Sequence, residues 1–418
     1  MSIRSSLGRA LQKVLFAGAC FALAALYLEI SFRNYAAEKL ASSDAAQLVE
    51  AVKLVPRNAG YHHRLGRHLF FAQQNVNGAI EEYRQAAELN PRAAAVWLDL
   101  ATAHGSLKQT SPQQQALERA LAADPRSPKT AWIAGQQYLA VGQTELALRQ
   151  FRVVIAHDPS TASAAIDLAW RATHDPELLL REAIPQSAAG HLAFLNYMVE
   201  RKEPAGAAQA WAEMVKLNDK FAPRLALPYV EFLLSSKHHD STAAVAVWRV
   251  LQGLETDFPA LAAPGLIVNA GFEQPIINAG LDWRFTPISG VNAAIDINDA
   301  RSGTKSLAVV LDGRPVDDVG VIQYLALRPS TRYEFSAYIR DESIAGAGGL
   351  RFQIGDAESA TSYYTSAQFP ETDSWQLLRG SFRTPVKIGV AILKIVRSPG
   401  GQPFRGRFWV DDVELTAK

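Results

Sequence analysis

The sequence contains a single cysteine, Cys20, and it lies in an apolar run near the N-terminus. No disulfide within the chain and no cysteine-ligated zinc site can therefore form. The sequence also lacks an excess of charge of either sign, because 42 basic residues stand against 41 acidic ones. Without a strongly basic composition, no binding of nucleic acid is predicted.

Catalytic signatures are missing as well. The sequence has no G-x-S-x-G elbow, no phosphate-binding loop and no H-E-x-x-H pair. The glycine-rich segment 346–349 is expected between strands, not at the strand-to-helix turn of a dinucleotide site. The carboxylate pairs Asp317-Asp318 and Asp411-Asp412 are adjacent in sequence, so in a strand the two members point to opposite faces. We therefore predict that the protein is not an enzyme.

Long apolar runs are confined to the N-terminus, where 15 residues from Val14 to Leu28 carry no charge. This run is shorter than the roughly 20 residues that span a bilayer, but the apolar stems of flanking basic residues extend it. Arg4, Arg9 and Lys13 precede it, which predicts a cytoplasmic N-terminus and an exported remainder.

Residues 1–33 are accordingly predicted to be a cytoplasmic basic start and a signal anchor, with residues 11–30 in the membrane. This makes the chain a single-pass protein of the inner (cytoplasmic) membrane whose bulk is periplasmic or extracellular. Two alternatives stay open. A cleaved signal peptide has the same charged start, and the segment 22–24 resembles a cleavage site. A lipoprotein would use Cys20, but the usual leucine three residues upstream is absent.

Prolines recur at a nearly constant spacing in the next part of the chain. Pro56, Pro91, Pro125 and Pro159 are separated by 35, 34 and 34 residues, and each follows a segment rich in alanine and leucine at helical spacing. Proline fits the first turn of a helix but not its interior. This period predicts stacked helix pairs, since one pair cannot bury its apolar face alone.

The residues between these prolines resemble the tetratricopeptide pattern of small and large side chains. The matching positions are Leu65, Gly66, Tyr83, Trp97, Leu100, Ala120, Gly135, Tyr138, Ala147 and Phe151. The resemblance implies an all-α solenoid over residues 40–257 whose concave surface binds a protein partner. Ser43 to Val55 is expected to be the second helix of an incomplete repeat. Adjacent histidines such as His62 and His63 do not share a helix face, so no metal site is predicted there.

The composition changes beyond the segment 258–265, whose prolines and glycine predict a linker. Short β-rich runs then alternate with turn residues over residues 266–418, which predicts a β-sandwich. The runs are Val321–Leu327, Arg332–Arg340, Leu350–Ile354, Trp375–Phe382, Val390–Val396 and Arg407–Leu415. In the second run, alternation places Tyr333 and Phe335 toward the core and Glu334 and Ser336 toward solvent.

Three motifs in this region resemble family 4/9 carbohydrate-binding modules, which share the galactose-binding-like jelly roll. They are Asn269–Glu273, Ser302–Leu307 and the closing Phe408–Leu415. The resemblance implies a jelly-roll sandwich that binds a polysaccharide, with Trp283 and Trp375 at core positions. Ser330 stands where the family has glycine, but the motifs are mostly structural and support the fold more than a ligand.

A sugar site needs aromatic faces and planar polar groups that bond hydroxyls. The candidates are Tyr338, Arg340, Arg351 and Gln353, expected to face outward, and the pair Tyr363 and Tyr364, expected on a loop. The family resemblance also implies a structural Ca²⁺ that ties the first strand to the last through oxygen ligands. Its ligands would be Glu273, the backbone of Lys305, and Asp411 or Asp412. Alternatively, Asp411-Asp412 caps a turn or meets the nearby Arg405 and Arg407.

These features together predict a multidomain protein: an N-terminal transmembrane helix, an all-α tetratricopeptide solenoid and an all-β jelly-roll sandwich. We expect a membrane-anchored, non-catalytic scaffold of the cell envelope, whose repeats hold a protein and whose sandwich holds a glycan. The resemblance suggests a role in polysaccharide assembly or export. Two alternatives stay open: an assembly factor whose sandwich has lost sugar binding, and a secreted glycan-binding adhesin.

Overall fold

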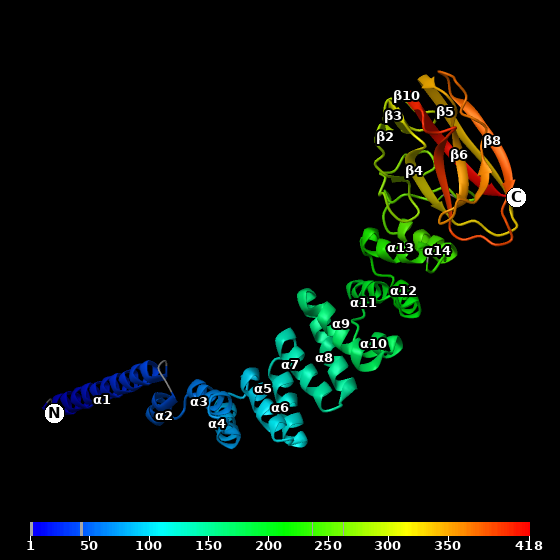
Figure 1. Cartoon of the computed structure of the whole chain (residues 1–418). Coiled ribbons are helices and arrows are strands. Elements are labelled where there is room, and N and C mark those ends of the chain that lie inside the picture. Colours follow the sequence, from blue (N-terminus) through cyan, green and yellow to red (C-terminus); the bar gives the residue numbers. More distant parts are fainter. Residues whose placement is uncertain (1–2, 42–44, 236, 262) are drawn as a thin grey trace. The chain divides into compact units, whose positions relative to one another are not determined.

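The computed structural model describes residues 3–41, 45–235, 237–261 and 263–418. The chain divides into two compact units, residues 1–185 and residues 186–418 (Figure 1). The predicted helix start at Ser43 lies outside the described residues, and the side chains of Arg4 and Arg9 are outside them too.

The first unit consists of helices, most of them in antiparallel pairs joined by short turns (Figure 1). They are α1 (Ile3–Ala41), α2 (Ala45–Leu54), α3 (Ala59–Phe71), α4 (Val76–Leu89), α5 (Ala94–Ser106), α6 (Thr110–Ala123), α7 (Pro128–Ala140), α8 (Thr144–His157), α9 (Pro159–Thr173) and α10 (Pro176–Glu182). Helices α3 to α8 form three such pairs, and this confirms the predicted repeat of helix pairs.

Helix α1 differs from the others because its apolar side chains are not covered. Phe16, Phe21 and Leu28 are 73%, 78% and 68% exposed. The helix is long and apolar enough to cross a membrane, a property that signal sequences share. Its C-terminal end is part of the array, since Ala37 is fully buried in one cluster with Ala51 and Tyr61. The apolar segment and the first packed helix are therefore one continuous helix.

Glycines in the repeats allow the paired helices to approach closely. A Cβ atom added to Gly66 of α3 would lie 2.7 Å from the ring of Tyr83 of α4. The same distance separates a Cβ on Gly135 of α7 from the ring of Phe151 of α8. Both rings are fully buried. The predicted packing of a small residue on one helix against a large side chain on its partner helix is therefore confirmed at these two pairs. Trp97 is only partly buried, although it occupies a signature position.

The second unit begins with two helix pairs. They are α11 (Ala188–Arg201) with α12 (Pro204–Leu217), and α13 (Leu227–Leu234) with α14 (Ser241–Gln252); the short 3-10 helix η1 (Pro223–Ala226) precedes α13. Both pairs lie within residues 40–257, for which the sequence predicted a helical solenoid.

Two antiparallel five-stranded sheets follow and form a β-sandwich, which confirms the predicted fold class. The first sheet has the strand order β1-β4-β9-β6-β7 and the second β2-β3-β10-β5-β8. The strands are β1 (Arg284–Phe285), β2 (Val291–Asp296), β3 (Ser306–Pro315), β4 (Asp318–Leu325), β5 (Arg332–Gly346), β6 (Gly349–Asp356), β7 (Ser362–Thr365), β8 (Gln376–Arg383), β9 (Ala391–Ser398) and β10 (Pro403–Ala417).

The sandwich core lies between the inner faces of the two sheets. Tyr333, Phe335, Ala337 and Ile339 of β5 are at most 1% exposed and point into it. The alternation predicted for this strand is therefore confirmed. Trp283 is also buried and its indole N–H donates to the carbonyl of Asn269 at 3.1 Å. Trp375 was predicted in the core as well, but it is only partly buried, just before β8.

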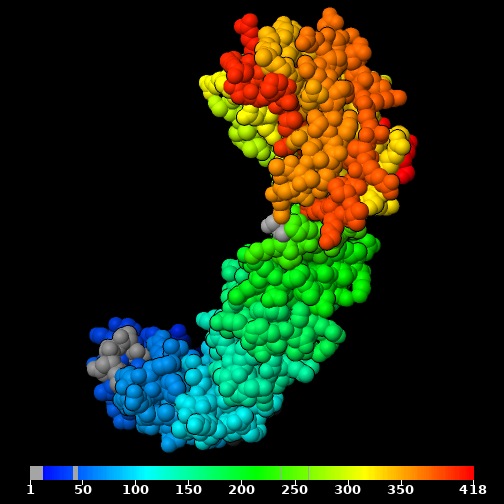
Figure 2. Space-filling view, turned by 45° about the vertical axis from the view of Figure 1, so that its right-hand side comes forward, coloured from blue at the N-terminus to red at the C-terminus, as the bar shows by residue number. Residues whose placement is uncertain are grey.

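The last helices pack directly on the sandwich (Figure 2). The indole N–H of Trp248 in α14 donates to the Pro259 carbonyl at 2.9 Å, and its ring lies 4.8 Å from that of Phe258. Glu231 of α13 accepts from the backbone N–H of Gly280 at 2.6 Å and from Arg284 at 2.8 Å. Residues 258–265, predicted as a linker, thus include buried, hydrogen-bonded positions.

Candidate functional site

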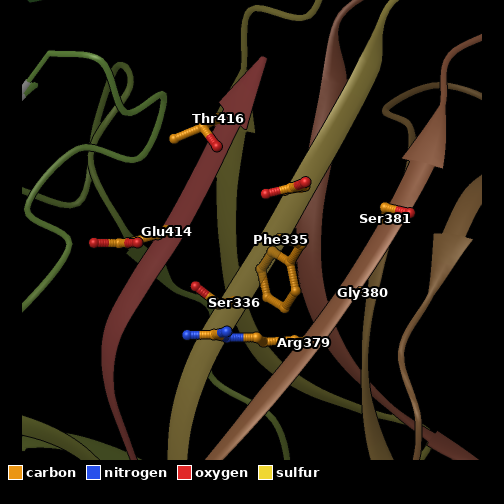
Figure 3. A pocket seen from close by; sticks show the side chains of 8 residues that line it. Phe335, Ser336, Arg379, Gly380, Ser381, Glu414 and Thr416 are labelled. Atoms are coloured by element: carbon orange, nitrogen blue, oxygen red, sulfur yellow. The ribbon is translucent and has the colours of Figure 1, made fainter. Parts of the chain in front are cut away.

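The outer face of the second sheet carries a polar trough of about 500 Å³ (Figure 3). Three adjacent strands, β10, β5 and β8, contribute its lining. The lining residues are Glu334, Phe335, Ser336, Arg379, Gly380, Ser381, Glu414 and Thr416. Apart from Phe335 and Gly380, each ends in a group that bonds a hydroxyl.

The strand register brings these side chains to one face. Ser336 pairs with Glu414 of β10 and with Arg379 of β8, and Glu334 pairs with Thr416 and Ser381 in the same way. An irregularity between Asp411 and Glu414 shifts the register of β10. Without this shift Glu414 would point to the other face, because side chains alternate along a strand.

The charges in the trough are unevenly compensated. Glu334 forms an ion pair with Lys418 at 3.1 Å. Within the described part of the chain, neither Arg379 nor Glu414 has a side-chain hydrogen bond or an ion pair, and both are exposed. In Figure 3 the Arg379 side chain extends from β8 across β5, beside Ser336. The trough therefore offers one free guanidinium and one free carboxylate to a ligand.

Two of the residues predicted to bind sugar, Tyr338 and Arg340, lie on this same face of β5, but their surfaces are occupied. The guanidinium of Arg301 lies 4.0 Å from the centre of the Tyr338 ring and donates to its hydroxyl at 3.1 Å. Arg340 forms an ion pair with Asp299 and stacks over Trp409, 4.7 Å from the ring centre. Trp409 is only 3% exposed, so neither ring presents a free stacking face.

The other four predicted sugar contacts belong to the opposite sheet. Arg351 and Gln353 face outward on β6, and Arg351 donates to the carbonyl of Ser366 at 2.9 Å. Tyr363 and Tyr364 lie on β7 rather than on a loop. Tyr364 packs inward, with its ring 5.2 Å from that of Phe382. The six residues therefore do not form one surface, because alternation along a strand does not say in which sheet the strand lies. Sugar binding by any of them stays a prediction.

The residues predicted to hold calcium are each bonded within the chain. Glu273 accepts from the backbone N–H groups of Thr304 and Lys305 at 2.8 and 3.0 Å, and Lys305 Nζ donates to the Glu273 carbonyl at 2.6 Å. Asp411 is fully buried and accepts from the backbone N–H of Arg301 at 2.8 Å. Burial raises the pKa of Asp411 to about 6, against these N–H donors. Asp412 forms an ion pair with Arg301 at 3.0 Å.

This arrangement does not fit a calcium ion as it stands. Calcium takes six to eight oxygen ligands, whereas here two cationic side chains already lie among the carboxylates. No group of three or more acidic, histidine or cysteine side chains in the described residues is placed to hold a metal. Calcium stays a prediction from resemblance. The arginine that pairs with Asp412 is Arg301, not the nearby Arg405 or Arg407 that the sequence suggested.

A second buried carboxyl, Asp282, makes stability depend on pH. It is fully buried; one oxygen accepts from the Ile277 backbone N–H at 2.7 Å and the other has no partner among the described residues. Burial raises its pKa from 3.8 to about 6. The folded protein thus binds this proton more tightly than the unfolded chain, so the associated stability is full below pH 4 and is lost as the pH rises through 6.

We expect Asp282→Asn to remove this dependence. From pH 4 to pH 7.5, the free energy of unfolding of the wild type should fall by about 2 kcal/mol relative to the variant. Urea denaturation across this pH range measures the difference. Parallel profiles for the two proteins would show that Asp282 is ionised at its ordinary pKa.

Two families of known proteins match parts of this chain. A model of the carbohydrate binding domain of the family 4/9 type matches residues 264–399, and a model of the tetratricopeptide repeat matches residues 68–108. Both confirm the resemblances that the sequence motifs indicated. Both are non-catalytic modules, for protein interaction and for carbohydrate binding. No curated protein matches the chain.

Several solved structures are similar to parts of this chain. A family 4 carbohydrate-binding module is 17% identical, covers 36% of this chain and 99% of its own, and has a TM-score of 0.29. A xylan-binding domain from Paenibacillus barcinonensis is 17% identical, with coverages of 38% and 97% and a TM-score of 0.28. The MamA protein is 17% identical, with coverages of 42% and 94% and a TM-score of 0.32.

Proposed function

With a tetratricopeptide repeat and a carbohydrate binding domain in one chain, we propose that the protein is a membrane-anchored, non-catalytic scaffold of the cell envelope. Its helical array binds a protein partner, and its sandwich binds a glycan in the polar trough on β10, β5 and β8. The polysaccharide is one that the partner machinery assembles or exports. The observation that carries the proposal is the trough itself.

The lining of the trough supports a hydroxyl-rich ligand. Ser336, Ser381 and Thr416 supply groups that both donate and accept hydrogen bonds, while Glu414 accepts and Arg379 donates. Sugar hydroxyls also do both, so the lining complements them. The trough is open to solvent along the sheet, which suits part of a long chain better than a small molecule.

The continuity of α1 supports a retained anchor over a cleaved signal peptide. Ala37 and Glu38 belong to the same helix as the apolar segment, and Tyr61 of α3 donates to Glu38 at 2.9 Å. Cleavage at the segment 22–24 would leave the exposed apolar side chains from Leu26 to Phe32 at a new N-terminus. Such a surface is costly in water and stable in lipid.

Blocking the trough tests the glycan proposal. We expect Ser336→Trp in the full-length protein to reduce glycan affinity more than about tenfold, because the indole fills the trough. The matched control is Gln353→Trp, which places the same side chain on the outer face of the other sheet. A glycan array followed by titration calorimetry of the best ligand measures the effect. If only the control variant lost binding, the glycan would be shown to bind the outer face of the other sheet instead of the trough.

One observation favours a second function, assembly without sugar binding. Arg301 covers the ring of Tyr338, and Trp409 is buried beneath Arg340, so two aromatic rings on this face have no free surface. A wild-type protein that binds no glycan on the array, yet retains its protein partner in a pull-down from envelope extract, would support this second function.

A further inference from the structure

Four arginines surround the trough on the outer face of the second sheet, and we call them the arginine row. Arg332 lies at the start of β5, Arg379 and Arg383 lie on β8, and Arg301 reaches the face from the segment between β2 and β3. Alternation puts the two β8 residues and Arg332 on the outward side, opposite the buried Phe382 and Tyr333. All four residues are exposed, and the side chain of Arg301 is 40% exposed.

Acidic side chains do not neutralise most of this row. Arg332 and Arg383 are direct cross-strand partners, and like charges in that position repel. The side chain of Arg332 contacts the Ser381 hydroxyl at 3.4 Å and that of Arg383 contacts the Ser330 carbonyl at 3.2 Å, and neither forms an ion pair within the described residues. Arg379 has no partner there at all.

The nearby carboxylates are few, and most of them already form ion pairs. Glu334 pairs with Lys418, Asp412 pairs with Arg301, and Asp299 pairs with Arg340. Glu414 alone is exposed in the trough without a cation. The face therefore has more free positive than negative charge, although the chain as a whole is nearly neutral.

We propose that the ligand of this trough is an acidic polysaccharide whose carboxylates are bound by the arginine row. The proposal rests on the glycan-binding function above and names the class of glycan. A guanidinium binds a carboxylate through two parallel hydrogen bonds. Arg379 has no partner among the described residues, so it is the arginine best placed to bind a carboxylate of the ligand. A bound anion between Arg332 and Arg383 also removes their mutual repulsion.

The geometry fits a polymer rather than a single sugar acid. Tyr338 is six positions after Arg332 along β5, which corresponds to about 20 Å. Arg301 lies over Tyr338 at the far end of this distance. Uronic acid units placed along the strand thus meet the uncompensated Arg332 and Arg383 at one end and Arg379 further along, whereas Arg301 at the other end is paired with Asp412. Neutral glycans are expected to bind this face more weakly than acidic ones, since a sugar ring can stack on Tyr338 only after Arg301 is displaced.

The test pairs each acidic glycan with its uncharged counterpart. Polygalacturonate, alginate and hyaluronate are immobilised next to their carboxyl-reduced forms, and binding of the full-length protein is measured by biolayer interferometry. We expect at least one acidic form to bind at least about tenfold tighter than its reduced form. Raising salt from about 50 to about 500 mM should weaken that binding steeply.

Charge-removing variants locate the effect. Arg379→Gln and Arg383→Gln should each lower affinity for the acidic form about tenfold and leave binding of any reduced form unchanged. Lys394→Gln is the matched control, because it removes one positive charge from the outer face of the other sheet. Equal affinity for acidic and reduced forms overturns the acidic ligand but keeps the glycan function. Absence of binding to every form overturns both, and wild-type affinity in both arginine variants overturns the arginine row.

Discussion

Replacing Trp248 with alanine should lower the free energy of unfolding of the C-terminal unit by about 4 kcal/mol. The indole is fully buried, donates to the Pro259 carbonyl at 2.9 Å and packs on Phe258. A Cβ atom on Gly280 would lie only 2.4 Å from it, so the loop before β1 closes tightly over the ring. The truncation leaves a cavity between α14 and this loop and a buried carbonyl without its donor.

Denaturant unfolding of the full-length protein measures the loss, and hydrogen–deuterium exchange locates it. We expect faster exchange in α14 and in residues 258–283, which the indole joins. Trp211→Ala is the control, because that side chain on α12 is only partly buried and lies 5.8 Å from Tyr229. If Trp248→Ala costs no more than the control, the helices and the sandwich are not coupled through this residue.

Arg397→Ala should cost about 3 kcal/mol, by a different mechanism. This β9 side chain is 4% exposed and donates to the carbonyls of Ala347 and Gln402, in two separate loops. Its guanidinium also stacks over the ring of Phe404, 4.3 Å from the centre. Removing it leaves two carbonyls without donors and opens space above the ring.

Three variants separate these contributions. Arg397→Lys keeps the charge but loses the planar fork, so it should recover less than half of the stability lost in Arg397→Ala. Arg397→Met keeps the packing on Phe404 and loses the donors. Arg351→Ala, on the outward side of the adjacent strand β6, should cost less than about 1 kcal/mol. Thermal unfolding measures all four, and a methionine variant as stable as the wild type would contradict the role of the donors.

The sequence predicted the fold class because its signals are local. The proline spacing and the small residues Gly66 and Gly135 are repeated along the chain, and each reports on a helix pair formed by neighbouring residues. The alternation in β5 is equally local. Strands β2 and β3 were not among the predicted runs, although the Ser302–Leu307 motif reaches the start of β3.

The candidate site was predicted only in part, because it depends on contacts between residues that are distant in sequence. Glu334, Ser336 and Tyr338 were expected to face outward, and they do, but nothing near them in sequence indicates Arg379 or Glu414 as neighbours. The register shift in β10 after Asp411 decides that Glu414 joins this face. Such a shift depends on pairing with β5, about 80 residues away in sequence.

The sequence by itself determined the apolar N-terminal helix, the helical repeats, the β-sandwich and the direction in which each β5 side chain points. The N-terminal helix follows from an uncharged run and the repeats from the proline spacing, while the directions of the β5 side chains follow from the two-residue period of a strand. The tertiary structure alone decided which sheet carries Arg351 and Gln353, that Arg301 covers Tyr338, and that Phe258 and Pro259 contact Trp248. Each of these depends on contacts between residues distant in sequence, which the pattern within one element does not encode.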